Sequence, residues 1–280
     1  MKIVMCRPDF FDVTYTLSNN RWMNLEVRPN QNLALIQWEY LLESYRIYGV
    51  DVGVMNGQPG LSDMVFIANA GLPLGKHFII SNFFHKERRP EVKHIRSFFS
   101  LDNNLWNMFV GDTFEGQGDA LLVTDRNILV GCGIRTNKKA VNTLSATMRY
   151  IDSSIRVIPL FFRKAEDYGK GERIFYHLDT CLLYLKKIET FLIYPRAFQR
   201  GTISLLRCLG DVMEVTKDEA ESFVCNSVVV DEDIIFTPKI GPGRIRNFLI
   251  GCGYKVLEHD MSEFIKSGGA VKCLSLEMYN

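Results

Sequence analysis

The recurring order of apolar segments along the chain is the sequence feature that most constrains its fold. A unit consists of two strand-like segments joined by a turn, a segment with helical spacing and a further strand-like segment. The units begin every roughly 50 to 60 residues, a period typical of propellers and other repeat architectures. Five such units predict an α/β fold in which the units close into a ring and their first residues line a central channel. An ordinary α+β domain with the same order by coincidence is the alternative.

The predicted elements follow from the spacing of apolar residues, which alternates in strands and recurs with the helical period in helices. The first unit contains a strand at Lys2–Met5, a helix at residues 32–45 and a strand at Val52–Met55. The later units begin with strand hairpins at residues 63–70 with 77–83, 120–125 with 128–133, 181–185 with 190–194, and 226–233 with 234–238. Helices follow at residues 88–100, 139–150 and 201–209 and from Gly243, and further strands at residues 155–162 and 254–259.

Length and charge limit the classes of protein to consider. The 280 residues, 47% of them hydrophobic, are enough for a large buried core. Lys and Arg (33) balance Asp and Glu (32), and the net charge of +1 gives no reason to expect nucleic acid or an anionic membrane as a partner. No stretch reaches the roughly 18 apolar residues of a membrane span, so we expect a soluble protein.

The N-terminus and the cysteines indicate the compartment. The first residues contain no long apolar run and no small-residue cleavage site, so we interpret them as mature sequence rather than a signal peptide. The seven cysteines are odd in number and include no CxxC pair, which argues against a disulfide framework and a structural zinc site. These features favour the reducing cytoplasm, and we predict neither a metal nor another cofactor.

Side chains that can do chemistry stand at matching places in successive units. They are Asp63, Glu115 with Asp119, and His177 with Asp179, each at the start of a predicted strand, and Cys273 after a Gly-Gly turn. In a ring of repeated units, equivalent positions converge at one end of the channel. The sequence therefore predicts a pocket that combines carboxylates, an imidazole and a thiol.

Such a pocket suits a guanidinium group. Carboxylates bind this planar, permanently charged cation through paired hydrogen bonds, which leaves its central carbon open to a thiolate. A bound cation also favours the thiolate form of a nearby cysteine. His177 can protonate the departing amine and then activate water. We predict that Cys273 attacks the guanidinium carbon of arginine or a close relative of arginine.

Each of these residues, taken alone, also has a structural explanation. Glu115 and Asp119 could cap a turn, His177 and Asp179 could form a surface pair, and Cys273 could be a core thiol. Arg88 and Arg89 could begin a solvated helix, and Asn69 could form a turn at the end of a strand. Their joint occurrence at matched positions favours the chemical interpretation.

The same residues resemble the guanidino-group-modifying enzymes, which include arginine deiminases, dimethylarginine dimethylaminohydrolases and amidinotransferases. The resemblance extends from CRPDFFDVTY, beginning at Cys6, to GGAVKC, ending at Cys273. It implies the pentein fold, a five-bladed α/β propeller of ββαβ-type repeats, in a single catalytic domain over residues 1–280. It further implies Cys273 as nucleophile and His177 as general acid and base, with guanidinium-binding carboxylates at Asp63, Glu115 and Asp179.

Within this superfamily the sequence is most similar to the arginine dihydrolase module of cyanobacterial ornithine–ammonia-cycle enzymes. DMVFIANAG, HKERRPE, FEGQGDAL, IRTN and FYHLDT carry the likeness. It implies that Asn20, Arg88 and Arg135 place the amino-acid end of arginine, and that Asn69 carries hydrolysis past citrulline to ornithine. Dimethylarginine hydrolases are acidic at Ala68-Asn69, which argues against methylated arginine.

The sequence departs from this pattern beside the site. Arg21 stands where the family usually has proline, the segment between Arg135 and His177 is longer, and Ser267 and Ala270 interrupt the glycine run. Four alternatives therefore remain: dimethylarginine hydrolysis, arginine deimination to citrulline, amidinotransfer, and a non-catalytic binding role. The partner that we expect is a small-molecule substrate, and a homo-oligomer remains possible.

Overall fold

The computed structural model describes residues 1–100, 104–107 and 112–279, and within them the fold is mixed α/β, as predicted. The strands of these residues form five three-stranded sheets, none of which closes on itself. In every sheet the central strand pairs antiparallel with one neighbour and parallel with the other. The five sheets thus share one topology, as expected for five copies of one unit.

The first sheet joins the two ends of the chain. Its central strand β1 (Lys2–Cys6) pairs in parallel with β2 (Asp51–Met55) and antiparallel with β15 (Leu276–Met278). The sequence pattern predicted only two strands in this unit. The third comes from the far end of the chain, and no local pattern predicts such a long-range pairing.

The other four sheets are each built from consecutive segments. Their strands are β3 (Gly71–Leu74), β4 (His77–Ile80) and β5 (Asn104–Asn107); β6 (Ala120–Thr124), β7 (Asn127–Cys132) and β8 (Arg156–Phe161); β9 (Leu182–Leu185), β10 (Thr190–Ile193) and β11 (Asp211–Glu214); β12 (Val228–Val230), β13 (Ile234–Pro238) and β14 (Lys255–His259). The strands β5 and β11 were not predicted.

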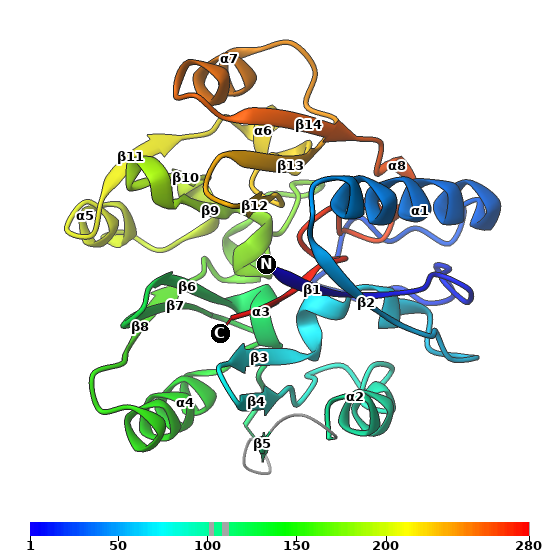
Figure 1. Cartoon of the computed structure of the whole chain (residues 1–280), viewed down its shortest axis with the longest axis horizontal. Coiled ribbons are helices and arrows are strands. Elements are labelled where there is room, and N and C mark those ends of the chain that lie inside the picture. The colour runs from blue at the N-terminus through cyan, green and yellow to red at the C-terminus, as the bar shows by residue number, and fades with distance from the viewer. Residues whose placement is uncertain (101–103, 108–111, 280) are drawn as a thin grey trace.

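A helix precedes the parallel strand in each unit, which gives the ββαβ order. These helices are α1 (Gln31–Ile47), α2 (Glu91–Phe99), α4 (Lys138–Ile151), α5 (Thr202–Leu206) and α7 (Arg244–Gly251). Figure 1 shows the sheets around the middle of the molecule and these helices on the outside. Asn30 and Asn137 begin α1 and α4 by accepting hydrogen bonds from Leu33 and Ala140 backbone N–H groups. Shorter helices are α3 (Gly116–Asp119), α6 (Lys217–Glu221) and α8 (Ser262–Ile265).

The prediction of a hairpin strand at residues 63–70 is wrong. This segment forms two short 3₁₀ helices, Ser62–Val65 and Ile67–Ala70, and the strand begins only at Gly71. Residues 62–70 are all buried, so the apolar run at residues 64–68 reflects burial on every side and not a strand. The matched acidic residues accordingly do not open strands. They lie in or beside single helical turns that precede the strands.

Two further observations bear on the predicted class of protein. Among the described residues, no helix combines the length and apolar character that a membrane crossing requires. All seven cysteines are free, and five of them are buried: Cys6, Cys132, Cys181, Cys225 and Cys273.

Candidate active site

A small buried cavity brings together most of the residues predicted from the sequence. Seven of the nine line it: Asn20, Asp63, Asn69, Arg88, Arg135, His177 and Cys273. The other two residues do not line the cavity: Glu115 contacts His177, and Asp179 contacts Cys273. The cavity volume is about 20 Å³, close to that of a single water molecule. An arginine-sized ligand therefore enters only if the wall of the cavity moves.

Glycines of the FEGQGD segment allow the single helical turns to approach one another. Gly116 has φ +57°, and a Cβ there would lie 2.6 Å from the backbone N of Gly71. A Cβ on Gly118 would lie 2.0 Å from Nδ2 of Asn69. Asn69 can therefore occupy its place beside the cavity because residue 118 has no side chain.

His177 lies in a buried charged network. Its Nε2 is 2.6 Å from Oε2 of Glu115, and Nη1 of Arg135 donates to the same oxygen at 3.0 Å. Burial alone would raise the pKa of Glu115, but Arg135 and His177 outweigh it and hold that pKa below its usual value. Burial lowers the pKa of His177 to about 4, against the opposing effect of Glu115. His177 is therefore neutral at pH 7.

Asp119 has a different position. Its Oδ2 accepts from the Thr136 hydroxyl at 2.6 Å, and its Oδ1 accepts from the backbone N–H of Leu178 at 3.2 Å. Thr136 in turn accepts from the backbone N–H of Glu115. Asp119 thus ties the third unit to the turn that carries His177, and it does not line the cavity.

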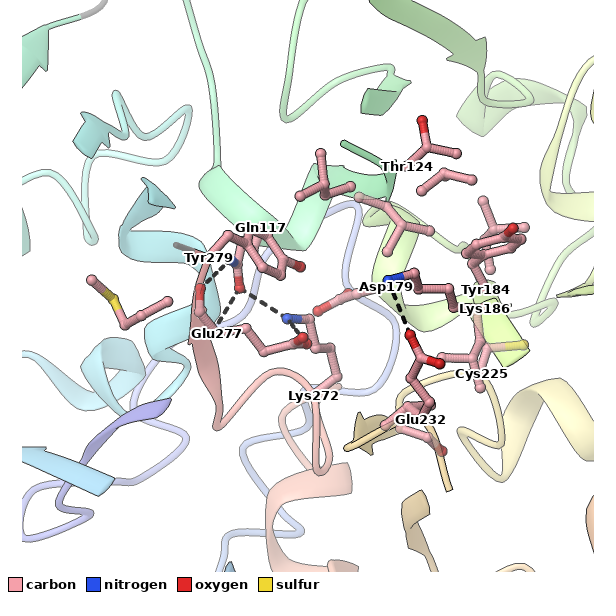
Figure 2. Close-up of a pocket in the computed structure, with 18 of the residues that line it drawn as sticks. Gln117, Thr124, Asp179, Tyr184, Lys186, Cys225, Glu232, Lys272, Glu277 and Tyr279 are labelled. Carbon is pink, nitrogen blue, oxygen red and sulfur yellow. Dashed lines mark hydrogen bonds and ion pairs between the residues drawn. The ribbon is translucent and has the colours of Figure 1, made fainter. Parts of the chain in front are cut away.

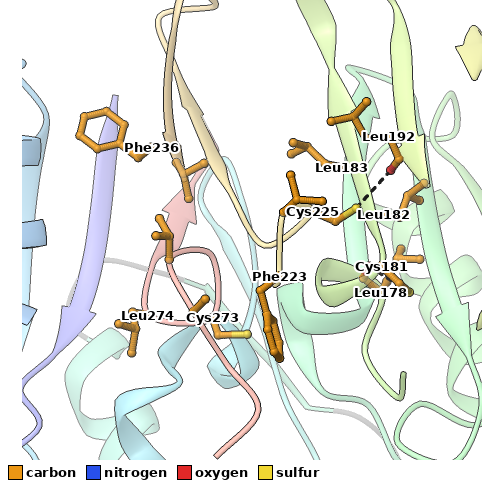
Figure 3. Close-up of a cluster of buried hydrophobic side chains, with 14 of the residues drawn as sticks. Leu178, Cys181, Leu182, Leu183, Leu192, Phe223, Cys225, Phe236, Cys273 and Leu274 are labelled. Atoms are coloured by element: carbon orange, nitrogen blue, oxygen red, sulfur yellow. Dashed lines mark hydrogen bonds between the residues drawn. The ribbon is translucent and has the colours of Figure 1, made fainter. Parts of the chain in front are cut away.

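Cys273 is held between an acceptor and a donor. Its Sγ donates to Oδ2 of Asp179 at 3.3 Å, and Nδ2 of Asn226 donates to Sγ at 3.1 Å. The thiol belongs to a buried apolar cluster that also contains Phe223 and Leu274, as Figure 3 shows. Burial, and secondarily the Asp179 carboxylate, raise the pKa of Cys273 well above its usual value.

Asp179 also lines a second, larger cavity of about 390 Å³. Figure 2 shows Asp179 there together with Lys272, whose Nζ binds Gln117 and Glu277 at 2.9 and 2.6 Å. Within the described part of the chain, Oδ1 of Asp179 has no hydrogen-bond partner. Burial raises the pKa of Asp179 to about 7, against the opposing effect of Lys272. This carboxyl therefore titrates near neutral pH.

Asp63 is buried and lines the same small cavity as His177 and Cys273. Its Oδ2 accepts from the Tyr15 hydroxyl at 2.6 Å, and its Oδ1 accepts from Ser267 at 3.4 Å. Asn20 donates to the carbonyl of Ser267 at 2.9 Å, so the segment before Cys273 is fixed from the first unit. Gly268 follows at φ +86°, where a side chain would be strained.

The two neighbouring arginines of HKERRPE differ. Arg88 is 3% exposed and forms a bidentate pair with Glu91, at 2.9 Å for both bonds. Its Nη1 also donates to Oδ1 of Asn69 at 2.7 Å. Arg89 binds the backbone carbonyls of Phe83 and Phe84 instead. The alternative interpretation, that Arg88 begins a solvated helix, is therefore wrong.

Comparison with known proteins identifies the family. The model of the family described as "N,N dimethylarginine dimethylhydrolase, eukaryotic" matches residues 8–280. The chain belongs to this dimethylarginine hydrolase family. This result confirms the resemblance to guanidino-group-modifying enzymes that the sequence motifs indicated.

Two curated relatives carry different activities. The chain is 32% identical to the bifunctional arginine dihydrolase/ornithine cyclodeaminase AgrE of Nostoc sp., over 99% of this chain and 38% of AgrE. It thus spans little more than a third of that relative. It is 30% identical to the N(G),N(G)-dimethylarginine dimethylaminohydrolase of Mycobacterium tuberculosis, over 99% of this chain and 86% of that protein.

A solved structure of similar shape is the N-terminal domain of ArgZ, a cyanobacterial arginine dihydrolase, bound to its substrate. Its TM-score is 0.88 at 31% identity, and the match covers 100% of this chain and 98% of that domain. Membership of the family and this likeness support the mixed α/β fold and leave the particular reaction to be argued from the site.

The sequence motifs did not indicate three residues that line the cavity: Leu17, Phe66 and Tyr176. They also did not indicate Tyr15 and Asn226, which contact Asp63 and Cys273. Asn226 stands just before the strand β12, as Asp179 stands just before β9. The matched-position argument that selected the carboxylates could therefore have selected Asn226 as well. Tyr15 gave no such signal, because it lies outside the predicted elements.

Proposed function

We propose that this chain hydrolyses the guanidinium group of free arginine to give ornithine, ammonia and carbon dioxide. The observation that carries the proposal is that Cys273 and His177 line one buried cavity together with Asp63 and Asn69. The chemistry needs no cofactor, because the nucleophile and the proton carrier are both side chains. We further propose that the five sheets are the blades of a pentein propeller, in one catalytic domain over residues 1–280 that acts in the cytoplasm.

Substrate binding in this proposal uses the charges around the cavity. Asp63, Glu115 and Asp179 bind the guanidinium group through charge-assisted hydrogen bonds. Arg88 and Arg135, with Asn20, bind the amino-acid end. Both arginines are already paired with glutamates, which fixes their side chains before substrate arrives.

The first half of the reaction begins from a neutral thiol and a neutral imidazole. The bound guanidinium favours thiolate formation, and the thiol proton passes to His177 as the S–C bond forms. His177 then gives this proton to the departing nitrogen, the C–N bond breaks and ammonia leaves. Water that loses a proton to His177 attacks the remaining adduct and releases the thiol.

The second half depends on Asn69. After the first hydrolysis the ureido group is neutral, so a carboxylate is no longer the best partner for it. The Asn69 amide can both donate to and accept from a ureido group. A second attack by Cys273 then releases ammonia, and hydrolysis of the remaining adduct gives carbon dioxide and ornithine. In total, arginine and two waters give ornithine, two ammonia and one carbon dioxide.

Dimethylarginine hydrolysis to citrulline and dimethylamine is the second candidate. It is favoured by the family model and by the Mycobacterium tuberculosis relative. Deimination that stops at citrulline uses the same first half-reaction. Amidinotransfer and a non-catalytic binding role are further alternatives, and the same experiment separates them.

The test is a mass-spectrometric product assay in which arginine, citrulline and asymmetric dimethylarginine are offered separately, with Cys273→Ala as control. Ornithine from arginine, abolished in the control, is the expected result. We expect the control to lose at least roughly 10³-fold in rate, because covalent catalysis is removed. Citrulline alone would make the chain a deiminase or a dimethylarginine hydrolase. Equal turnover by Cys273→Ala would overturn the proposed nucleophile.

A further inference from the structure

Asn226 contacts the sulfur of Cys273 and has no role in the function proposed so far. It is fully buried and lies 47 residues from Cys273 in the chain. Its Nδ2 is 3.1 Å from Sγ and also donates to the backbone carbonyl of Asp179 at 3.1 Å. One amide group therefore touches both the nucleophile and the turn that carries its carboxylate neighbour.

The orientation of this amide is fixed by backbone groups. Oδ1 of Asn226 accepts from the backbone N–H groups of Ala270 and Cys273, at 3.1 and 3.2 Å. A flipped amide would place its NH₂ group against these two donors and its oxygen against the carbonyl of Asp179. Three backbone groups thus enforce a single orientation, in which Nδ2 faces the sulfur.

The backbone of Asn226 is fixed as well. Its carbonyl accepts from the N–H of Lys272 at 3.1 Å, and its own N–H donates to Phe223 at 2.8 Å. The donor directed at Sγ is therefore held rigidly, and no rearrangement is needed when negative charge develops on the sulfur.

We propose that Asn226 is a further catalytic residue, whose side-chain N–H stabilises the thiolate of Cys273 and fixes the loop that carries it. A hydrogen bond to the charged form of a group favours that form. The effect opposes Asp179, whose carboxylate disfavours a second negative charge beside it. The inference rests on the proposed function insofar as the thiolate is the nucleophile, but it can be tested without any substrate.

The test is the alkylation of Cys273 by iodoacetamide, in which the thiolate forms an S–C bond and iodide leaves. The rate is followed peptide by peptide by mass spectrometry from pH 7 to pH 10. The exposed Cys208 serves as an internal standard. Asn226→Asp keeps an acceptor for Ala270 and Cys273 but replaces the donor at the sulfur with a carboxylate oxygen, so it removes the hydrogen bond to the thiolate and adds repulsion. We expect its Cys273 rate at pH 8 to fall about tenfold, as for a rise of one unit in thiol pKa.

The matched control is Ser227→Ala. Ser227 is the next residue, is also buried, and binds Val224 and Thr237 away from the sulfur. A merely structural role of this segment predicts similar losses in both variants, whereas our inference predicts a loss only in Asn226→Asp. An unchanged Cys273 rate in folded Asn226→Asp would overturn the inference.

A double variant keeps the inference testable if Asn226→Asp does not fold. Asp179→Asn combined with Asn226→Asp exchanges the amide and the carboxylate on the two sides of the sulfur and leaves the local charge unchanged. We expect its Cys273 rate to return to within about threefold of the wild type. The opposite result is that Cys273 is alkylated as slowly in the double variant as in Asn226→Asp, or about tenfold more slowly than in wild type. Either rate would count against Asn226 acting as a donor.

Activity measurements separate this inference from the proposed function. If Asn226→Asp lowers alkylation but no variant turns over arginine, the inference holds and the proposed function fails. If arginine is hydrolysed and Cys273 of Asn226→Asp is alkylated at the wild-type rate, the proposed function holds and the inference fails. Should both hold, Asn226→Asp lowers kcat about tenfold with little change in KM, since Asn226 touches the nucleophile and not the substrate.

Discussion

The His177 side and the Cys273 side of the cavity each place a buried carboxylate against a reactive group, yet the two carboxylates differ in charge. Glu115 accepts a hydrogen bond from Arg135, and its pKa is held below the usual value despite burial. Among the described residues, no arginine donates a hydrogen bond to Asp179. Burial raises its pKa to about 7, and the nearby Lys272 binds Gln117 and Glu277 instead.

The difference shows that burial alone does not set the charge of a carboxyl group. A guanidinium in direct contact compensates for lost hydration, whereas an ammonium held by other groups compensates only in part. The His177 side therefore carries a permanent anion that can stabilise an imidazolium. The Cys273 side carries a carboxyl whose charge depends on pH and on any cation that binds beside it.

The largest effect on kcat in this comparison should follow from removing the permanent negative charge of Glu115. Glu115→Gln retains an oxygen near His177 but no charge to stabilise the imidazolium, so we expect kcat to fall about a hundredfold. Steady-state kinetics with the substrate identified by the product assay measures this. Glu91→Gln, which breaks the other buried Arg–Glu pair, is the comparison. It should raise KM through Arg88 more than it lowers kcat.

One outcome would contradict this prediction. If Glu91→Gln and Glu115→Gln lower kcat to the same extent, the losses come from breaking a buried ion pair and not from the position of Glu115 beside His177.

A smaller effect should follow from neutralising the other carboxylate, Asp179, and it should increase the reactivity of Cys273. Asp179→Asn removes a negative charge 3.3 Å from the sulfur, so the pKa of Cys273 should fall. We expect alkylation of Cys273 at pH 8 to rise about tenfold. Arginine turnover should fall at the same time, because a guanidinium partner is lost. Alkylation that stays constant or slows would contradict the repulsion between Asp179 and the thiolate.

The parts of the molecule also differ in how far the sequence could predict them. His177, Glu115 and Cys273 could be found from motifs, because each belongs to a short segment with a distinctive composition. The pairing of β15 with β1 could not, because it joins the two ends of the chain. Residues 63–70 were misassigned because a short buried apolar run does not distinguish a strand from helical turns. Asn226 was overlooked because an asparagine before a strand is an ordinary turn residue until its neighbours in space are known.

The smallest effect concerns stability and again contrasts the two carboxylates. A buried Asp179 with pKa about 7, against a usual value of 3.8, holds its proton more tightly in the folded than in the unfolded state. Its contribution to stability is therefore complete below about pH 4 and is lost as pH rises through 7. Asp179→Asn lacks this titration, so its melting temperature relative to wild type should increase by a few degrees from pH 5 to pH 8.

Glu115 provides the control for that measurement, because its pKa is lowered. Its contribution is present above its unfolded pKa and is lost only as pH falls into the acid range. The melting temperature of Glu115→Gln relative to wild type should therefore change less than that of Asp179→Asn between pH 5 and pH 8, and only through the smaller shift that the Glu115 charge imposes on the pKa of Glu91. Glu91, whose pKa burial raises to about 7, titrates in both wild type and Asp179→Asn and cancels from that difference. A difference for Asp179→Asn that is the same at pH 5 and pH 8 would mean that Asp179 does not titrate in this range, and the contrast between the two sides would be lost.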